Sequence, residues 1–183
     1  MPAKLVILDR DGVINFDSVQ FIKSPEEWKP IPGSLEAIAK LRQNGYRVVV
    51  ATNQSGLGRE LFDMDTLNRI HQKMHKSVTA LGGQIDAIFY CPHPADSQCD
   101  CRKPKPGMFK RISETMNVDL TNVPCIGDSL RDLQACAVVG CTPMLVMTGK
   151  GEKTKAEGNL PEGTLEFADL AAAVEHILAK EKK

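Results

Sequence analysis

The stretch Lys4–Gly12, KLVILDRDG, sets the fold of this chain because an apolar run passes directly into an acidic turn. Residues 4–9 carry adjacent aliphatic side chains, some of them β-branched, and this pattern predicts a strand that is buried on both faces. Four further apolar runs have the same character, at 46–52, 85–90, 123–127 and 144–147. Helix-like segments alternate with them, at 35–41, 63–81, 107–116, 129–139 and 167–180. The alternation predicts a doubly wound α/β domain built on a parallel sheet.

Length and composition limit the class of protein. The 183 residues are enough for one well-packed domain and too few for two ordinary ones, so we expect a single domain over residues 1–183. The 23 Lys and Arg residues balance the 23 Asp and Glu residues, which gives no reason to expect nucleic acid or an anionic membrane as a partner. The sequence has no apolar run of spanning length and no signal peptide, so we expect a cytoplasmic protein, and a monomer.

Two carboxylates, Asp9 and Asp11, stand where the first predicted strand ends. One carboxylate at such a place can attack phosphorus, and the second can hand a proton to the leaving oxygen. A cation must then neutralise the charge between the nucleophile and the phosphate. Gly12 lets the backbone turn sharply and approach a ligand. A solvated acidic turn would explain this pair equally well if it stood alone.

Polar side chains also follow other predicted strands, and the carboxyl ends of parallel strands meet at one edge of a sheet. Asp128 and Asp132 follow the strand at 123–127, where their oxygens suit Mg²⁺, although Asp128 could instead cap the next helix. Residues 52–55, TNQS, offer donors to phosphate oxygens or form a plain polar turn. Residues 102–107, RKPKPG, supply a phosphate clamp or a solvated basic loop. The shared position of these segments favours one site for phosphoryl transfer.

A C-x-H-x₅-C-x-C array follows the strand at 85–90 and consists of Cys91, His93, Cys99 and Cys101. Four thiol and imidazole ligands within eleven residues are typical of a closed, structural Zn²⁺ site, so we expect a zinc-bound loop at 91–101. Such a site would also position the Arg and Lys at 102–103. The alternative is a set of free thiols with a surface histidine.

Two other features are interpreted as structural. His71 and His75 lie four residues apart on a predicted helix, but neither adjoins a predicted strand end, so we interpret them as surface histidines. Cys125 lies between apolar residues near the Asp128 strand end, which predicts a buried structural thiol.

Four motifs occur in an order that resembles the haloacid dehalogenase superfamily of phosphatases: DRDG at 9–12, TNQSG at 52–56, the lysines at 103–105 and GDSLRD at 127–132. The CPH and CDCRKPKPGM segments and the near-absence of a cap insertion resemble the histidinol-phosphatase/heptose-bisphosphatase branch of that superfamily. The resemblance implies a Rossmann-like sheet with a minimal cap. It also implies Mg²⁺-dependent hydrolysis of a phosphate ester through an aspartyl-phosphate.

The resemblance further implies a role for individual positions. Asp9 would be the nucleophile and a Mg²⁺ ligand, Asp11 the general acid and then the base with its main-chain carbonyl on Mg²⁺, and Asp128 the remaining protein ligand. Thr52 and Lys103 would steady the transferring phosphoryl group. The residues implied to contact substrate are Asp17, Ser18, Val19, Gln20, Thr52, Asn53, Gln54, Ser55, Arg102, Lys103 and Ser129. The Zn²⁺ ligands would be Cys91, His93, Cys99 and Cys101.

The implied substrate is a small sugar bisphosphate, used in making heptose for a bacterial envelope. Arg102 would meet the second, non-reacting phosphate or the sugar, and the run at 148–151, TGKG, resembles the heptose side of the branch. Asp132 would have a supporting role. Whether Lys105 shares the role of Lys103 stays open at this point.

Three other functions compete with this interpretation. A histidinol-phosphate phosphatase would share the catalytic motifs, the zinc loop and the fold. A DNA 3′-phosphatase would call for a basic stripe or an aromatic platform, and neither is evident. A catalytically silent, zinc-stabilised binding module would have no use for intact Asp9, Asp11 and Asp128.

Overall fold

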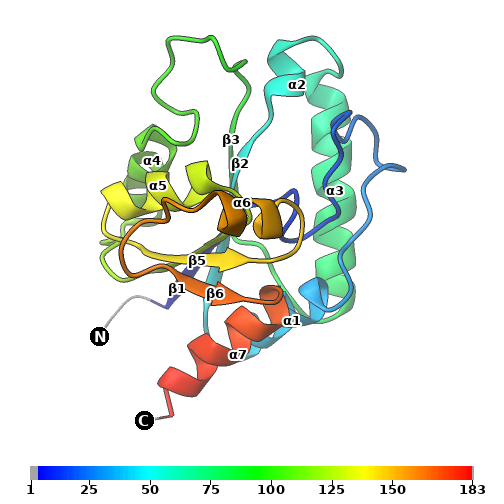
Figure 1. The fold of residues 1–183 in the computed structure, drawn as a ribbon. Helices are drawn as coiled ribbons and strands as arrows, with labels where there is room; N and C mark the ends of the chain where they lie inside the picture. Colours follow the sequence, from blue (N-terminus) through cyan, green and yellow to red (C-terminus); the bar gives the residue numbers. More distant parts are fainter. Residues whose placement is uncertain (1–3, 183) are drawn as a thin grey trace.

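The structure is a computed structural model that describes residues 4–182, and its centre is a six-stranded sheet (Figure 1). The strands are β1 (Leu5–Leu8), β2 (Arg47–Asn53), β3 (Ala87–Cys91), β4 (Pro124–Gly127), β5 (Thr142–Val146) and β6 (Leu165–Phe167). They lie in the order β3-β2-β1-β4-β5-β6, and every neighbouring pair is parallel. The predicted doubly wound parallel sheet is confirmed.

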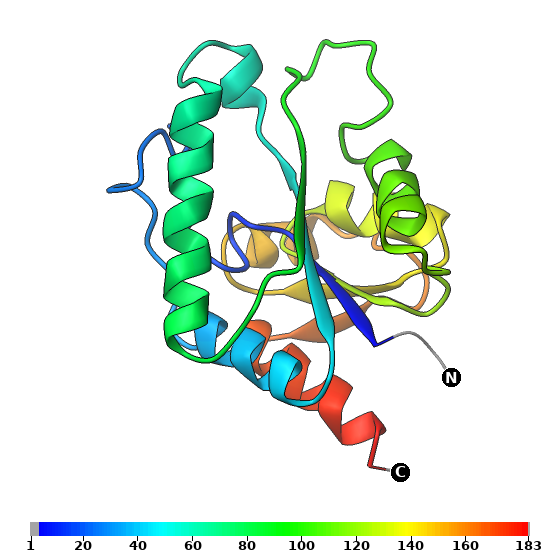
Figure 2. The ribbon, with the colours of Figure 1, turned by 180° about the vertical axis from the view of Figure 1, so that it is seen from behind.

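Helices cover both faces of this sheet (Figure 2). One face is covered by α1 (Ser34–Gln43), α3 (Met64–Ala80) and α7 (Leu170–Lys180). The other face is covered by α4 (Gly107–Met116) and α5 (Leu130–Val138). Two short helices, α2 (Ser55–Gly58) and α6 (Gly151–Glu157), lie in the connections that follow β2 and β5. Within residues 4–182, no helix is both long and apolar enough to cross a membrane.

The position of strand β1 between two layers of helices explains why its sequence is continuously apolar. Its side chains point alternately to the two faces, and both faces are covered by helices. Val6 and Leu8 belong to the core beneath α1, α3 and α7, whereas Leu5 and Ile7 belong to the core beneath α4 and α5. All four side chains are fully buried. A strand in this position has no face exposed to solvent, and its side chains are therefore all apolar.

Three elements differ from the sequence prediction. Phe167 was expected to begin the last helix, but it ends strand β6, and α7 begins only after Asp169, whose side chain accepts a hydrogen bond from the backbone N–H of Ala172. Strand β6 has three residues and pairs on one side only, so it carries too little periodicity to be recognised. The short helices α2, of 4 residues, and α6, of 7 residues, were not predicted either, because segments of this length also carry too little periodicity.

The position of β1 between β2 and β4 places the site. The chain leaves β1 for β2 on one side and reaches β4 on the other, which makes the end of β1 the point where the strand order reverses. Open parallel sheets bind their ligands in the crevice at such a point. The residues that follow β1, β2 and β4 therefore converge, with Asp9 in the middle.

Candidate active site

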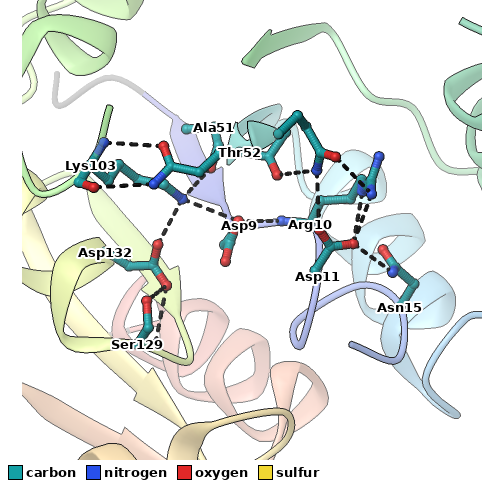
Figure 3. Close-up of polar contacts among 11 residues, drawn as sticks. Asp9, Arg10, Asp11, Asn15, Ala51, Thr52, Lys103, Ser129 and Asp132 are labelled. Atoms are coloured by element: carbon teal, nitrogen blue, oxygen red, sulfur yellow. Dashed lines mark hydrogen bonds and ion pairs between the residues drawn. The ribbon is translucent and has the colours of Figure 1, made fainter. Parts of the chain in front are cut away.

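A buried ammonium group holds the centre of the site together. The Nζ atom of Lys103 lies 3.1 Å from Asp9 Oδ1 and 2.7 Å from Asp132 Oδ1, and it donates to the Ala51 carbonyl oxygen at 2.7 Å (Figure 3). The residue is only 2% exposed. Burial by itself would lower the pKa of Lys103, but the carboxylates of Asp132 and Asp9 outweigh it and raise the pKa above its ordinary value. Lys103 is therefore a permanent positive charge beside Asp9.

Asn53 fixes the loop that delivers Lys103. Its side-chain nitrogen donates to the Lys103 carbonyl oxygen, and its side-chain oxygen accepts from the Lys103 backbone N–H, both at 3.1 Å. This pair of hydrogen bonds ties the loop after β3 to the end of β2. Lys105, two residues farther on, is exposed and donates to the Cys99 carbonyl oxygen at 2.7 Å. Of the two lysines, Lys103 alone lines the site.

Three carboxylates crowd at the ends of β1 and β4. Oxygen atoms of Asp9, Asp128 and Asp132 lie within 4.8 Å of one another. Burial, together with the negative charge of Asp132, raises the pKa of Asp9 to about 7. Burial, with the charges of Asp132 and Asp9, raises the pKa of Asp128 to about 8. The cluster carries more negative charge than Lys103 neutralises, which is the condition that favours a bound cation.

The free oxygens of this cluster fit a hard cation. Asp9 Oδ1 accepts from Lys103 Nζ and from the Arg10 backbone N–H, and Asp128 Oδ2 accepts from the Lys150 backbone N–H. Asp9 Oδ2 and Asp128 Oδ1 receive no hydrogen bond from any residue that the structure describes. Two unpaired carboxylate oxygens on adjacent strand ends are a suitable donor set for Mg²⁺, which keeps several of its waters. The residues present therefore fit this ion.

Two glycines allow the chain to approach Asp128 closely. Gly12 has a φ of +84°, and a Cβ atom on it would collide with the Asp128 carboxylate. Gly149 has a φ of +57°, and a Cβ atom there would strike the same carboxylate. The Thr148 hydroxyl donates to the Gly12 carbonyl oxygen at 2.6 Å. The loop after β5 thus presses the turn after β1 against Asp128, and neither glycine leaves room for a side chain.

Replacing Gly12 with alanine is therefore expected to disrupt the site. The substitution adds backbone strain at a positive φ, and its methyl group displaces Asp128 from the cation site. We expect the rate of phosphate release to fall at least about 100-fold and the melting temperature to drop. Gly82, which also has a positive φ but has open space around its Cβ position, is the matched control. If Gly12→Ala loses no more activity than Gly82→Ala, the close packing against Asp128 is not required.

Asp11 is held by donors on both oxygens (Figure 3). Its Oδ1 atom accepts from Arg10 Nε at 3.0 Å and from Asn15 Nδ2 at 2.9 Å, and it lies 2.9 Å from Arg10 Nη2. Its Oδ2 atom accepts from Gln54 Nε2 at 3.1 Å. Burial would raise the pKa of Asp11, but the charge of Arg10 and these hydrogen bonds outweigh it and lower the pKa.

His71 is not the surface histidine that we expected. Its side chain is buried, and its Nε2 atom lies 3.1 Å from Nη1 of Arg10, next to the β1 strand end. The periodicity of α3 carries the signal that was missed, because His71 stands on the same face as Leu67, Ile70 and Met74. His75 is half-buried and lines a hollow whose wall also includes the edge of His71. The expectation for Cys125 agrees with the structure, where this thiol is buried.

A cavity of about 380 Å³ opens above these residues. The predicted residues that line it are Asp9, Asp11, Asp17, Ser18, Val19, Asn53, Gln54, Ser55, Arg102, Lys103 and Asp128. The residues that line it without having been given a substrate or metal role are Phe21, Ile22, Arg59, Ala95, Arg131, Asp132 and Lys150. Besides Lys103 at the base, four of the lining side chains are cationic: Arg59, Arg102, Arg131 and Lys150. The cavity thus has carboxylates at its base and positive charge around them, which suits a substrate with more than one phosphate.

Three predicted residues do not line this cavity. Thr52 is buried beneath it, where its Oγ1 atom accepts from Gln54 Nε2 at 2.9 Å. Ser129 directs its hydroxyl to Asp132 Oδ2 at 2.8 Å and caps helix α5. Gln20 is exposed and lines a neighbouring hollow instead. The alternative that Asp128 caps α5 is wrong, because Ser129 and Asp132 form that cap.

Thiol and imidazole groups converge in the loop after β3, where the sequence predicts zinc. Around one tetrahedral Zn²⁺, two sulfurs lie about 3.8 Å apart and a sulfur and a nitrogen lie about 3.6 Å apart. The Cys91 and Cys99 sulfurs are 3.8 Å apart, and His93 Nδ1 lies 3.5 Å from Cys91 Sγ and 3.4 Å from Cys101 Sγ. The sulfurs of Cys91 and Cys101 are closer, at 3.0 Å. The donor set fits one Zn²⁺, and each of these distances except the one between Cys91 and Cys101 is close to the tetrahedral spacing.

Comparison with known proteins agrees with this geometry. Residues 3–140 match the haloacid dehalogenase-like hydrolase family. A D-glycero-beta-D-manno-heptose-1,7-bisphosphate 7-phosphatase from Bordetella bronchiseptica is 60% identical over 175 residues, which are 96% of this chain and 98% of that protein. The protein of the same name from Pseudomonas aeruginosa is 52% identical, covering 97% of this chain and 99% of that protein.

A solved structure is also similar along the whole length. The D,D-heptose 1,7-bisphosphate phosphatase of B. bronchiseptica, complexed with magnesium and phosphate, superposes with a TM-score of 0.96 at 59% sequence identity, and the match covers 97% of this chain and 99% of that one. The matched family residues include the ends of β1, β2, β3 and β4, which carry the acidic cluster and Lys103. On sequence and fold alike, this chain belongs to the haloacid dehalogenase-like hydrolase family.

Proposed function

We propose that this chain is a Mg²⁺-dependent phosphatase that removes the 7-phosphate of D-glycero-β-D-manno-heptose 1,7-bisphosphate. The observation that carries the proposal is the position of Asp9, which lies between Lys103 and Asp128 at the base of a cavity rimmed by cations. The B. bronchiseptica and P. aeruginosa relatives that bear this name match almost the whole chain, which supports the substrate.

The proposed reaction has two displacements at phosphorus. A carboxylate oxygen of Asp9 attacks phosphorus, and the bond from phosphorus to the sugar oxygen breaks. The sugar oxygen keeps the electron pair of that bond and takes a proton from Asp11. Asp11, now ionised, removes a proton from water as the water attacks the aspartyl-phosphate. The bond from phosphorus to Asp9 breaks, which releases inorganic phosphate, frees the Asp9 carboxylate and leaves Asp11 protonated as at the start. Each proton that Asp11 gives in the first step is thus regained in the second.

The surrounding residues stabilise the charge that develops on the phosphoryl oxygens. Asp9, Asp128 and the main-chain carbonyl of Asp11 would hold Mg²⁺, which supplies positive charge between the nucleophile and the phosphate. Lys103 supplies a second, fixed positive charge. Thr52 lies buried beneath the cavity and accepts a hydrogen bond from Gln54, so its own hydroxyl proton would have to meet a phosphoryl oxygen from below. Arg102 would bind the phosphate that does not react, together with the other cations of the rim.

A phosphate-release screen tests this function. The purified chain, with Mg²⁺, is offered the heptose 1,7-bisphosphate, the related sugar monophosphates and histidinol phosphate, and kcat/KM is compared. We expect the bisphosphate to give the highest value, because its second phosphate meets the cationic rim. A higher value for histidinol phosphate would overturn the substrate. Undetectable release from every compound would support a binding module in place of an enzyme.

We further propose that Zn²⁺ has a structural role, bound by Cys91, His93, Cys99 and Cys101. These residues lie in a loop that has little apolar core of its own, so a metal supplies the folding energy that packing does not. The loop continues directly into Arg102 and Lys103. Zinc would therefore position the substrate contacts without touching the substrate.

Substitution of Cys101 by serine is expected to release zinc and lower activity. The hydroxyl is a poor zinc ligand, and loss of the metal loosens the segment that carries Lys103. Zinc content by atomic absorption should fall from about one equivalent to near zero, and kcat should fall about 10- to 100-fold. The matched control is Cys141→Ser, a buried thiol outside this cluster. Unchanged zinc content in Cys101→Ser would remove the zinc assignment.

We also propose that the protein acts in the bacterial cytoplasm, as a monomer, in the synthesis of heptose for the cell envelope. All six cysteines are unpaired, which fits a reducing compartment. The bacterial relatives support the pathway through the activity in their name.

A further inference from the structure

The guanidinium of Arg10 lies directly behind the proposed general acid and takes no part in the reaction described above. The side chain is fully buried, with an exposed fraction of 0%. Its Nε and Nη2 atoms face Asp11, its Nη2 atom also donates to Gln54 Oε1 at 3.3 Å, and its Nη1 atom faces His71. Three side chains, from the turn after β1, the connection after β2 and helix α3, thus fix one planar group.

The contact with His71 allows one arrangement of protons. A guanidinium can only donate hydrogen bonds, so Nε2 of His71 must present its lone pair to Nη1 of Arg10. His71 is then a neutral imidazole with its proton on Nδ1. Burial, followed by the adjacent charge of Arg10, lowers the pKa of His71 to about 3, which is consistent with a neutral ring. The charge of Asp11 acts in the opposite direction on the pKa of His71 but is outweighed, and His75, on the next turn of α3, acts in the same direction as Arg10.

His71 accepts the hydrogen bond from Nη1, the end of the Arg10 guanidinium that does not face Asp11. Within residues 4–182, no other side chain accepts a hydrogen bond from Nη1 of Arg10. The histidine stands in the middle of α3, a helix of 17 residues whose buried face packs into the core. A rigid acceptor in this place holds the Nη1 end of the guanidinium, while Asp11 Oδ1 and Gln54 Oε1 hold its Nε and Nη2 side, and together they set its plane.

The orientation of Arg10 decides which oxygen of Asp11 can carry a proton. Oδ1 already accepts from Arg10 and Asn15, whereas Oδ2 accepts only from Gln54. Gln54 must turn its Oε1 atom to Arg10, which has no acceptor, and this leaves its Nε2 atom for Asp11 Oδ2. Oδ2 therefore keeps a free lone pair, and it is the oxygen that can hold the transferable proton.

We propose that His71 is a positioning residue for the general acid: as a neutral acceptor it holds Arg10, and through Arg10 it aims Asp11 Oδ2 at the leaving oxygen. This role rests on the proposed phosphatase function, because it acts on the step in which the sugar oxygen takes its proton. His71 itself touches neither the substrate nor the reacting atoms.

The leaving group provides a readout that a purely structural role would not change. An alkoxide is a poor leaving group and depends on a proton from Asp11, whereas p-nitrophenolate leaves readily without one. The ratio kcat/KM reports the steps up to departure of the leaving group, so it excludes the later hydrolysis of the aspartyl-phosphate. We expect His71→Leu to lower kcat/KM about 10- to 100-fold for the heptose bisphosphate and less than about 3-fold for p-nitrophenyl phosphate.

Three matched variants sharpen the experiment. His71→Gln can place an amide oxygen near the former Nε2 position, and we expect it to recover most of the activity on the bisphosphate. His75→Leu removes the other histidine of α3, which has no contact with Arg10, and it should behave as wild type on both substrates. In an Asp11→Asn background, where the acid is already absent, adding His71→Leu should cause no further loss. Circular dichroism and zinc content confirm that each variant is folded.

Specific results would overturn the role of His71. An equal loss of kcat/KM on both substrates would place the effect on the phosphoryl group itself. A full additive loss of kcat/KM in the Asp11→Asn background, or no rescue by His71→Gln, would also contradict the role. If His71→Leu does not fold, Arg10→Gln is used for the same comparison of leaving groups.

The test stays separate from the choice of substrate. A series of aryl phosphates with leaving groups of increasing basicity measures the same dependence without heptose. If the bisphosphate fails as a substrate but His71→Leu steepens this dependence, the substrate is wrong and the positioning role stands. A wild-type protein that hydrolyses neither the bisphosphate nor any aryl phosphate would overturn both.

Discussion

Replacing Asp9 with asparagine is expected to abolish phosphate release while leaving the fold intact. The amide cannot form the acyl-phosphate bond, so we expect kcat for the heptose bisphosphate to fall about 10⁴-fold or more. The melting temperature without Mg²⁺ should stay the same or rise, because one of three crowded negative charges is removed. Continuous phosphate detection and a thermal denaturation curve measure the two effects.

The matched control for this variant is Asp65→Asn. Asp65 is an exposed residue in the first turn of α3 that pairs with Arg69 at the surface. It should keep wild-type activity, which excludes a general effect of removing a carboxylate. Turnover by Asp9→Asn at a rate close to wild type would contradict a covalent intermediate on this residue. Unchanged zinc content shows that the fold is retained.

Substitution of Lys103 by methionine is expected to damage both stability and catalysis. Methionine fills a similar space but leaves the buried carboxylates of Asp9 and Asp132 without their counter-charge. Loss of one partner from a buried ion pair costs about 3–5 kcal/mol in the free energy of unfolding. The loss of a fixed positive charge at the phosphoryl group should lower kcat about 10²- to 10³-fold. Urea denaturation and kinetics at saturating substrate measure these losses.

Lys105→Met is the control, because Lys105 lies in the same loop and its exposed side chain makes, within residues 4–182, a single hydrogen bond, to the Cys99 carbonyl oxygen. It should change stability and activity little. Adding Asp132→Asn to Lys103→Met should restore much of the stability, since it removes the carboxylate that is only 2.7 Å from the ammonium group. Activity should not return. Equal stability of the Lys103 and Lys105 variants would contradict the buried ion pair.

The sequence predicted the sheet and most of the site because these depend on burial over several residues. Strand β1 is apolar on both faces and is followed at once by polar residues. This contrast can be recognised in the sequence whichever strands lie beside β1. Strand β6 was missed because three residues at a sheet edge carry no such contrast. Boundaries shifted by a residue or two elsewhere, as at Asn53, which belongs to the end of β2.

Details of the site depend on where each side chain points, and the order of residues in the sequence does not give these directions. Lys103 and Lys105 lie in one basic segment, and only the hydrogen bonds from Asn53 explain why the first one enters the site. Ser129 follows Asp128 in the chain, yet its hydroxyl turns to Asp132 and the helix cap. His71 could have been placed on the buried face of α3 from its spacing, but its contact with Arg10 joins residues 61 positions apart.

The close approach of Gly12 and Gly149 to Asp128 bears on how such an enzyme can evolve. A side chain at either glycine would collide with the carboxylate, so we expect a substitution at these positions to disturb the site whichever substrate is bound. The mouth of the cavity is under no such restriction, as Val19 is 95% exposed there. New substrate preferences can therefore arise by changes in the segment around Val19, while the hydrolytic chemistry is inherited unchanged.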